Sequence, residues 1–506
     1  DLTEAARNPD SLRDRPSARL MEEATNETLA DAHNIPALSY TRYRDVQRYA
    51  DRTIYQQPWG EKRAKLAAVA LQVLLGRDEY LNLLYDYIWS ICEETNWILP
   101  QREDLTIDLR TAATTMDLAE IIVALRHKME DRIVERVRTE INRRVFTDYL
   151  ENHGKRELLW WKGRNNWNGV CNGGIGVGFL LLEQDTSRLA HGLEVVLEGL
   201  QVFLDTAFAE DGGSGEGVGY WQYGLSNYIA FAEMLRLRTK GAIDLLNNGR
   251  VQTIARFAPA VVLSPGRYFP YSDCREEVAL NPGLLACLAE RTGVGELRGL
   301  LAEPAPLTRG VGLFHTLWRS ILWWDGARPP RPRLGDVILP DSGVARLVGE
   351  AASGAAVVLA AKAGHNGVSH NHNDIGTFVL HVDDETYLCD PESGVYDNYV
   401  KQGRYNVIFA NSFGHSVPVI GGKLQSEGET FRGEIVRYEP GGTEKRVDME
   451  LRGAYEIPAL AKVLRSFRLS ATGDLVLEDT FAFTDGALPV EEAFVTWNNT
   501  MVAGRT

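Results

Sequence analysis

The sequence predicts a multidomain α+β protein in which a helical domain is followed by an antiparallel β-sandwich. Apolar residues recur at helical spacing from Glu61 to about residue 324. Short strand-like runs separated by turns take over after about residue 340. The run Pro329-Pro330-Arg331-Pro332 separates the two patterns. A chain of 506 residues also exceeds one ordinary hydrophobic core, so we expect two or three domains.

The chain is expected to divide into three parts. Residues 1–55 are polar and weakly periodic, and they predict a leading segment with short helices. Residues 56–330 form the predicted helical domain, and residues 331–506 form the predicted β-sandwich. The abrupt C-terminus is compatible with a truncated sandwich.

The prediction of a helical domain is based on stripes of apolar residues at helical spacing. The first begins after Glu61 and places five apolar residues at i, i+3, i+4, i+7 and i+8. These residues are Leu66, Val69, Ala70, Val73 and Leu74. Further helices are predicted at about residues 78–94, 115–145, 177 onward, 189–204, 222–240, 243–256, 279–293 and 311–324. The helices share no fixed-period sequence repeat, so a helical-repeat solenoid is not expected.

Two glycine-rich breaks interrupt these helices. Residues 163–174 are rich in Asn and Gly and predict a loop, with helix resuming near Val177. Residues 211–220 predict a second loop, which opens into a helix. The glycines at 174, 176 and 178 do not form a dinucleotide-binding fingerprint, and no strand precedes them.

The prediction of a sandwich is based on short runs of β-branched and apolar residues that are bounded by turns. Strands are predicted at residues 344–348, 356–360, 378–382 and 386–389. Residues 463–469 and 475–483 form a hairpin pattern across a turn at 471–474.

Charge and cysteine content exclude several classes of protein. The formal net charge of -15 argues against a nucleic-acid or anionic-membrane partner, because both favour a basic surface. It leaves an anionic small or polymeric substrate open, because a pocket can be locally basic. The five cysteines are far apart and form no CxxC pair, so we expect buried or free thiols. No apolar run approaches the ~18 residues of a membrane span.

The compartment and the oligomeric state stay open. The chain begins at Asp1 and shows no signal peptide. A periplasmic or secreted location is expected if a leader has been removed, and a cytoplasmic one otherwise. No feature of the sequence reports on oligomeric state.

The first candidate functional element is the Asn-rich run at residues 164–168. A glycine-rich loop between helices explains the later Asn-Gly-Gly, but it explains Arg164, Asn166 and Trp167 less well. Asparagine donates hydrogen bonds to a carboxylate without adding charge, and Trp offers a flat face to a sugar ring. The run therefore suits a site for a sugar that carries a carboxylate.

The second element is the run from Glu216 to Tyr223. A glycine-rich loop here opens into a helix that carries three aromatic residues, Tyr220, Trp221 and Tyr223. Aromatic packing at a helix start explains this pattern equally well. The functional interpretation places the Tyr220 hydroxyl at a loop–helix junction as an acid or base, with Tyr223 as its alternative.

The third element is the sequence Ser369 to Asp374. His370, His372 and Asp374 alternate, so in an extended strand they would project from one face. A hairpin at residues 378–390 would return Asp390 to the same end of the sheet, and His415 lies in a later loop. His372, Asp390 and His415 have the ligand types of a zinc site, although their long spacings are not diagnostic.

Together these runs resemble the heparinase II/III and oligo-alginate lyase group of polysaccharide lyases. The runs Asn-Asn-Trp-Asn-x-Val-Cys-x-Gly-Gly, Glu-Gly-x-Gly-Tyr-Trp-x-Tyr and His-x-His-Asn-Asp-x-Gly-x-Phe occur in that family's order. The resemblance covers roughly residues 60–430. It implies an incomplete (α/α) toroid followed by an antiparallel β-sandwich, and β-elimination on a uronic-acid-containing glycan that leaves a 4,5-unsaturated sugar.

The resemblance also implies roles for individual residues. Asn166 matches the asparagine that neutralises the uronate carboxylate, and Tyr220 matches the tyrosine that protonates the leaving oxygen. His370 matches the histidine that acts as base or second carboxylate contact. Position 167 is Trp where some relatives have His, so more of the proton transfer falls to Tyr220 and His370.

The remaining site residues are expected to bind substrate or metal. His372, Asp390 and His415 match a structural zinc site in this group, and no organic cofactor is expected. The expected substrate is an anionic poly- or oligosaccharide, with no nucleic-acid or membrane partner. The substrate contacts expected are Arg164, Trp167, Trp221, Tyr271, Asp273, Tyr396 and Arg404.

Three alternatives remain open. A glycoside hydrolase on a similar toroid would need two carboxylates, for which Asp211 and Glu216 are available. A non-catalytic glycan-binding relative would bind without turnover. A zinc hydrolase would need an open metal position and a nearby glutamate base.

Overall fold

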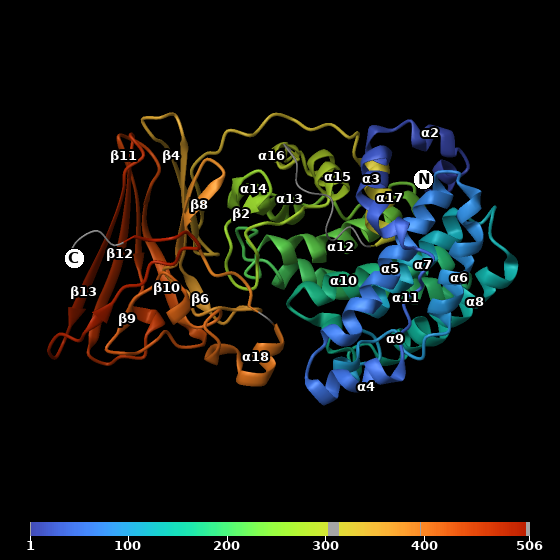
Figure 1. Cartoon of the computed structure of the whole chain (residues 1–506), viewed down its shortest axis with the longest axis horizontal. Coiled ribbons are helices and arrows are strands. Elements are labelled where there is room, and N and C mark those ends of the chain that lie inside the picture. Colours follow the sequence, from blue (N-terminus) through green and yellow to red (C-terminus); the bar gives the residue numbers. More distant parts are fainter. Residues whose placement is uncertain (1, 302–312, 395, 502–506) are drawn as a thin grey trace. The chain divides into compact units, whose positions relative to one another are not determined.

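The computed structural model describes residues 2–301, 313–394 and 396–501. They fall into two compact units, whose elements are labelled in Figure 1. The first unit consists of Asp1–Ala207, Trp221–Gln252 and Ala279–Pro330. The second consists of Phe208–Tyr220, Thr253–Val278 and Arg331–Thr506. The second unit thus takes two segments from within residues 56–330, which the sequence analysis assigns to the helical domain.

The first unit is helical. Its helices within the first 207 residues are α1 (Leu2–Ala6), α2 (Pro9–Arg13), α3 (Pro16–Ala30), α4 (Tyr40–Tyr49), α5 (Thr53–Leu74), α6 (Leu81–Cys92), α7 (Leu109–Ala124), α8 (Asp131–Ile141), α9 (Thr147–Asn152), α10 (Asn166–Leu182) and α11 (Thr186–Thr206). Later helices are α12 (Val218–Arg238), α13 (Gly249–Ala255), α15 (Pro282–Thr292), α16 (Glu296–Gly299) and α17 (Phe314–Trp323). The first residues of α12 and the last of α13 are assigned to the second unit.

Helix α10 differs from the prediction, because it includes most of residues 163–174, for which the sequence analysis predicts a loop. It packs against α7 and α11 (Figure 1). Its glycines also allow close packing against α12, which carries Asn227 and Phe231. A Cβ atom on Gly173 would lie 2.6 Å from the backbone of Asn227, and one on Gly176 would lie 2.6 Å from Phe231. The Asn/Gly composition therefore reflects tight helix packing rather than a turn.

A second correction concerns the single helix predicted at about 115–145. The chain forms α7 and α8 instead, with a break after Leu125 where Lys128 donates its backbone N–H to the Leu125 carbonyl. The two helices bury different surfaces. Residues of α7 are buried nearly all round, whereas α8 has one buried stripe that includes Ile133 and Val137. One continuous helix cannot present both surfaces.

The second unit is built on antiparallel sheets, as the sequence predicts for its C-terminal part. One five-stranded sheet has the order β3-β4-β5-β7-β8, and the other has the order β13-β12-β11-β10-β6. The first is formed by β3 (Val337–Leu339), β4 (Val344–Glu350), β5 (Ala356–Lys362), β7 (Phe378–Val382) and β8 (Glu385–Leu388). The second is formed by β6 (Gly364–Asn366), β10 (Gly428–Glu439), β11 (Glu444–Glu450), β12 (Leu460–Ser470) and β13 (Leu475–Phe483).

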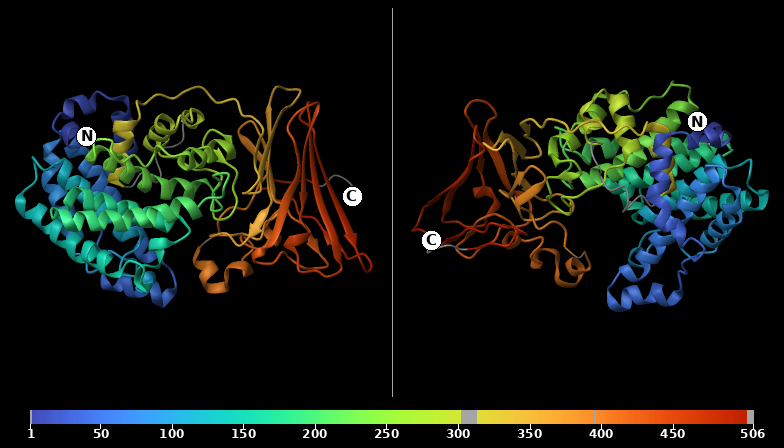
Figure 2. Two further views of the ribbon diagram at one scale, coloured as in Figure 1. Left: turned by 180° about the vertical axis from the view of Figure 1, so that it is seen from behind. Right: turned by 45° about the horizontal axis from the view of Figure 1, so that its top comes forward.

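The two sheets share one apolar core, which makes this unit a sandwich (Figure 2). Leu347 and Leu359 come from the first sheet, and Met449 and Leu469 come from the second. The rings of Phe378 and Phe467 lie 5.0 Å apart between their centroids. The predicted hairpin is confirmed as β12 paired with β13.

Short elements complete the second unit. They are α14 (Phe257–Val261), β1 (Val262–Ser264), β2 (Arg267–Tyr268), α18 (Tyr396–Gln402), β9 (Val419–Ile420) and β14 (Val490–Glu491). The sequence analysis missed the β1–β2 pair, because two strands of two or three residues give no periodic signal. The loop that follows β2 contributes to the candidate site.

Candidate active site

His370 lies in the loop between β6 and β7, and its backbone corrects the predicted strand. The sequence analysis expects His370, His372 and Asp374 on one extended edge. His370 instead has φ +58°, in the left-handed region that non-glycine residues rarely adopt. Such a conformation persists only where its surroundings fix it, and it is commonly found at functional sites.

Three side chains of the second unit surround the His370 ring. Its Nδ1 lies 2.6 Å from Oδ2 of Asp273, and its Nε2 lies 3.7 Å from Oε1 of Glu216. The Tyr220 ring stacks on the imidazole with centroids 4.3 Å apart and an interplanar angle of 23°. The His370 side chain keeps 18% of its surface exposed, so a substrate can reach it.

Asp273 is the buried carboxylate on which these contacts depend. It accepts hydrogen bonds from His370, from Nε2 of His372 at 3.0 Å and from Nη2 of Arg404 at 2.7 Å. Burial by itself would raise the pKa of Asp273, but the three donors outweigh it and hold that pKa well below the usual range. Asp273 is therefore ionised and accepts only, which makes Nδ1 the donor in His370.

His372, Asp374 and His415 form a buried cluster of the metal-binding type. One ligand atom from each lies within 4.8 Å of the others. Nδ1 of His372, Oδ2 of Asp374 and Nε2 of His415 have no hydrogen-bond partner among the described residues. Unpaired buried polar atoms are rare in folded proteins, and three that converge indicate a site for an ion.

The neighbours of this cluster orient its ligand atoms. His415 Nδ1 donates to Oδ2 of Asp390 at 2.7 Å. Burial opposes the charge on each, yet the pair holds the pKa of His415 above its ordinary value and that of Asp390 below. Lys362 pairs with Oδ1 of Asp374 and so leaves Oδ2 for the cluster.

The donor set fits zinc. Two imidazole nitrogens and one carboxylate oxygen are ligands that zinc takes readily. The carboxylates of Asp273 and Asp390 hold the opposite nitrogens of His372 and His415, as hydrogen-bonded partners of metal-ligating histidines commonly do. The sequence analysis places Asp390 in the ligand set, whereas here Asp374 faces the cluster and Asp390 supports His415.

In the helical unit, Asn166 opens α10 and is buried. Neighbouring asparagines have structural roles. Asn165 caps the helix by accepting from the Trp167 backbone N–H at 3.1 Å. Asn168 donates to the Gly163 carbonyl at 3.1 Å, and Asn172 donates to Asn168 Oδ1 at 2.8 Å.

Tyr223, the alternative to Tyr220, also lies in the helical unit. Its hydroxyl is buried and has no hydrogen-bond partner among the described residues. Burial raises the pKa of Tyr223. Trp167 is partly exposed, and the Arg102 guanidinium lies 5.0 Å from its ring centroid. The sequence analysis did not single out Arg102, because no motif surrounds it.

Several predicted substrate contacts take other positions. Trp221 and Tyr271 are buried, and the Tyr271 hydroxyl donates to the Ser214 carbonyl at 2.8 Å. Asp273 is likewise buried beneath its three donors. Arg164 is exposed. Tyr396 begins α18, but its side chain lies outside the described residues.

Arg404 lies beside His370 in the second unit. It donates from Nε to the Asn371 carbonyl and from Nη2 to the His370 carbonyl, both at 2.7 Å. The guanidinium also stacks over Tyr399, 4.6 Å from its ring centroid. Arg404 therefore holds the loop, with a side chain that is 22% exposed.

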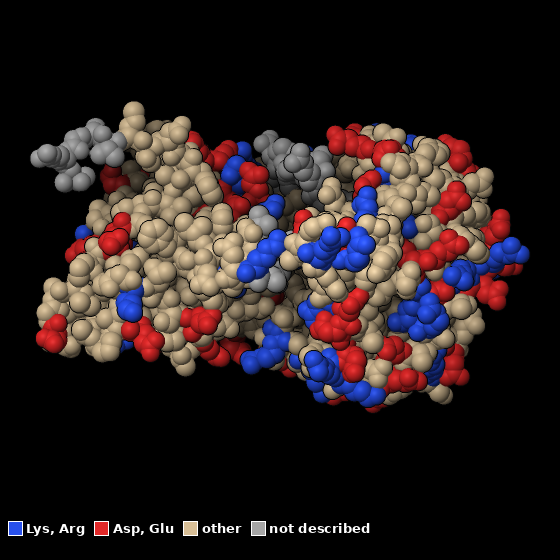
Figure 3. Space-filling model, turned by 60° about the horizontal axis from the view of Figure 1, so that its bottom comes forward, with Lys and Arg blue, Asp and Glu red and all other residues tan. Residues whose placement is uncertain are grey.

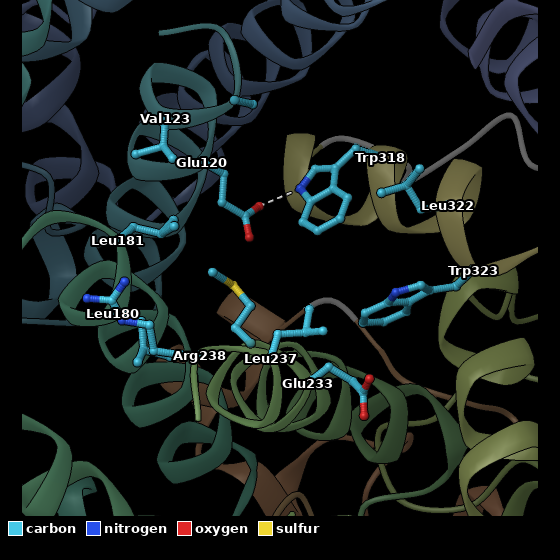
Figure 4. A pocket seen from close by; sticks show the side chains of 12 residues that line it. Glu120, Val123, Leu180, Leu181, Glu233, Leu237, Arg238, Trp318, Leu322 and Trp323 are labelled. Atoms are coloured by element: carbon cyan, nitrogen blue, oxygen red, sulfur yellow. Dashed lines mark hydrogen bonds between the residues drawn. The ribbon is translucent and has the colours of Figure 1, made fainter. Parts of the chain in front are cut away.

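A separate pocket of about 400 Å³ lies in the helical unit (Figure 4). Its wall is mainly apolar and includes Leu237, Trp318 and Trp323. Glu120 accepts from the Trp318 indole N–H at 2.6 Å and also pairs with Arg319. Since none of its described lining residues is a predicted site residue, this pocket contributes nothing to the chemistry above.

The side of the molecule drawn in Figure 3 is not uniformly basic. On the side drawn in Figure 3, groups of Lys and Arg lie among Asp and Glu, most densely over the helical unit. Across the described residues, no helix combines the length and apolarity that crossing a membrane requires.

Comparison with known proteins agrees with this architecture. Residues 331–494 match the family model described as heparinase II/III-like, C-terminal. The C-terminal part of the chain is a heparinase II/III-like domain. This match confirms the predicted family resemblance for the C-terminal part of the chain. A search of curated proteins found no significant match.

Solved structures extend the similarity beyond the heparinase II/III-like domain. A heparinase III structure has a TM-score of 0.60 at 13% identity, over 85% of this chain and 63% of that chain. A second heparinase III structure gives 0.57 at 13% identity, over 92% and 70%. A heparan sulfate lyase HepC mutant from Pedobacter heparinus gives 0.55 at 13% identity, over 86% and 63%.

These matches confirm the predicted fold class, an incomplete (α/α) toroid followed by an antiparallel β-sandwich. This chain spans less than two thirds of the first of these heparinase III structures. Outside the family motifs, the site residues that sequence reasoning missed are Asp374 as a ligand and Asp273 as a support. The sequence analysis places Asp374 on the histidine edge and Asp273 among the substrate contacts, but it assigns Asp374 no ligand role and Asp273 no supporting role.

Proposed function

We propose that this protein is a polysaccharide lyase that cleaves a uronic-acid-containing glycan by β-elimination. The observation that carries the proposal is the environment of His370. A partly exposed imidazole is hydrogen-bonded through Nδ1 to a buried carboxylate, and a tyrosine ring stacks on it. An imidazole oriented in this way can exchange a proton with a substrate through its Nε2.

The proposed reaction breaks two bonds on neighbouring carbons of the uronate. The proton on C5 is removed, the C4–O4 bond breaks, and a C4–C5 double bond forms. The departing O4 takes up a proton. We assign proton transfer to Tyr220 and His370, with Tyr223 as the alternative to Tyr220. General acid–base catalysis of this kind contributes roughly 10²–10⁴-fold to the rate.

The difficult part of this reaction is the negative charge that develops beside the carboxylate when C5 loses its proton. We assign its stabilisation to Asn166, whose amide can donate to the carboxylate. Arg164 and Trp167 are proposed as further contacts to the anionic glycan, and Arg102 joins them because it stacks on Trp167. Cations over an aromatic face suit an acidic sugar polymer.

The metal-type cluster is proposed to bind zinc through His372, Asp374 and His415. The bound ion would supply positive charge that holds together two loops of the second unit. Its three protein ligands are all buried, so a structural role suits it better than direct contact with substrate.

The hydrolase alternative needs a pair of available carboxylates. Asp211 is committed to structure, since it accepts from the Ser342 backbone N–H at 2.8 Å and from the Ser342 hydroxyl at 2.6 Å. Glu216 faces His370. This arrangement favours elimination, and a glycan-binding protein without activity would show binding but no product.

The decisive experiment measures the ultraviolet absorbance of the unsaturated uronate over a panel of heparan sulfate, chondroitin, hyaluronan and alginate. The structural relatives named heparinase III and heparan sulfate lyase put heparan sulfate first in the panel. We expect absorbance to rise with one class of polymer. New reducing ends without that absorbance would refute the lyase proposal and favour hydrolysis.

Three tyrosine variants then assign the proton donor. We expect Tyr220→Phe to lower kcat by about 10²-fold or more, because it removes the proposed acid. Tyr387→Phe is the matched control, since Tyr387 is 48% exposed on β8. If Tyr220→Phe keeps full activity and Tyr223→Phe loses it, the donor is Tyr223.

A further inference from the structure

One carboxylate, that of Asp273, holds two histidines with different proposed tasks. Its Oδ2 accepts from His370 Nδ1 at 2.6 Å, and its Oδ1 accepts from His372 Nε2 at 3.0 Å. The side chain of Asp273 is 2% exposed, so solvent does not compete for these bonds. It reaches both histidines from outside their loop, from the segment that follows β2.

Arg404 fixes Asp273 relative to the loop that carries both histidines. One of its nitrogens donates at 2.7 Å both to Asp273 Oδ1 and to the His370 backbone carbonyl. Its Nε donates to the Asn371 carbonyl at 2.7 Å. The guanidinium thus ties the carboxylate to the backbone on which the two histidines are carried, and it balances the charge of Asp273.

The two hydrogen bonds point the opposite ring nitrogens of the two histidines in different directions. Because His372 donates from Nε2 to Asp273, its Nδ1 is left for Asp374 and His415 in the cluster. Because His370 donates from Nδ1, its Nε2 is left on the side where Glu216 and the partly exposed surface lie. A shift of the Asp273 carboxylate would therefore disturb a metal ligand and a catalytic imidazole together.

We propose that Asp273 is a positioning residue that couples occupancy of the metal cluster to the orientation of His370. The inference rests on the proposed function only for what His370 does, and not for the coupling itself. Zinc bound through His372 Nδ1 fixes that ring, which fixes Asp273, which fixes His370. Coupling between two sites is reciprocal, so a change at Asp273 must weaken zinc binding as well.

The loop conformation supports this role. His370 occupies a left-handed backbone conformation, and its ring has to be held against that strain. Asp273 contacts the ring through Nδ1, and Arg404 donates to the His370 carbonyl. Loss of the Asp273 carboxylate removes a hydrogen bond that orients the ring, while Tyr220 still stacks on one face.

The first test compares Asp273→Asn with Asp384→Asn, a control on a carboxylate that is 53% exposed and pairs with Arg331. Zinc alone is titrated into protein stripped with a chelator. We expect Asp273→Asn to weaken zinc binding by about 10–100-fold, as changes to such supporting carboxylates do. With the active polymer, kcat should fall about 10²-fold while KM stays within about twofold, because ring orientation rather than substrate binding is lost.

The second test uses the unaltered protein and needs no substrate. With ¹⁵N-labelled histidine, the ring signals of His370 are assigned by their loss in His370→Gln and followed as zinc is added. We expect zinc to shift and sharpen them in the wild type and to leave them unchanged in Asp273→Asn. The wild-type measurement still tests the coupling if Asp273→Asn does not fold.

The outcomes separate the two proposals. Zinc that binds the wild type without moving the His370 signals overturns the coupling, as does wild-type protein that binds no zinc. Zinc affinity unaffected by Asp273→Asn also overturns it. If zinc moves the signals but no uronate polymer is cleaved, the coupling stands and the lyase proposal fails.

Discussion

Burial governs the chemistry of all five cysteines, none of which is disulfide-bonded. It raises the pKa of Cys274 to about 11 and those of Cys92 and Cys389 to about 12. It raises the pKa values of Cys171 and Cys287 as well. The nucleophile is the thiolate, which a raised pKa makes scarce at neutral pH.

We therefore expect the native protein to resist thiol reagents. At pH 8 a thiol with a pKa near 11 is ionised in only about one molecule in a thousand. Reaction with a chromogenic disulfide should be slow in buffer and should reach five thiols per chain in denaturant. Rapid labelling of one cysteine in the native state would contradict the burial described for it.

The candidate site shows which residues a sequence can identify. Asn166, Tyr220 and His370 lie within short runs whose composition is unusual, so the runs predicted them as site residues. Asp273 lies in an ordinary stretch after a two-residue strand, and only folding brings it to His370. The sequence analysis placed it near substrate because it could not foresee three donors around one carboxylate.

At the level of helices, α10 shows how the same composition can mislead. Glycine and asparagine are typical of turns, so residues 163–174 predicted a loop. The sequence does not show which helix packs against α10. The Asn227 backbone of α12 approaches Gly173 so closely that a side chain cannot fit. The strands of the sandwich were easier to predict, because β-branched runs separated by turns report local structure.

A glycine pair tests this account of α10. We expect Gly173→Ala to destabilise the protein by about 1–3 kcal/mol, because the new Cβ would overlap the Asn227 backbone at 2.6 Å. Gly60→Ala in α5 is the matched control, since nothing lies within 4 Å of its added Cβ. That change should be neutral or stabilise by up to about 1 kcal/mol.

The measurement is the urea midpoint of unfolding for both variants beside the wild type. Equal midpoints for the two alanine variants would contradict the close packing of α10. A lower midpoint for Gly60→Ala alone would show that α5, rather than α10, is the crowded helix.

For the molecule as a whole, the metal-type cluster predicts a dependence of stability on zinc. An ion that binds only the folded state stabilises it by about 2.7 kcal/mol at a free concentration 100-fold above its Kd. Chelation should accordingly lower the unfolding temperature, and zinc should restore it. Differential scanning calorimetry with and without a chelator measures the shift.

A histidine pair controls for non-specific effects of the chelator. His372→Gln should abolish the response to zinc, whereas His191→Gln should retain it, because His191 lies on α11 with a side chain that is 53% exposed. If neither the chelator nor zinc changes the unfolding temperature, the cluster is a hydrogen-bonded core that binds no ion.

The division of the chain into units has a consequence for how such proteins can recombine. The family match begins at residue 331, yet the compact unit that contains it also includes Phe208–Tyr220 and Thr253–Val278. These two segments carry Glu216, Tyr220 and Asp273. A chimera spliced at the Pro329–Pro330 junction would keep His370 but give it foreign neighbours. His370 and the loops around it must therefore be inherited together, although Asp273 lies 97 positions and Tyr220 150 positions before it in the sequence.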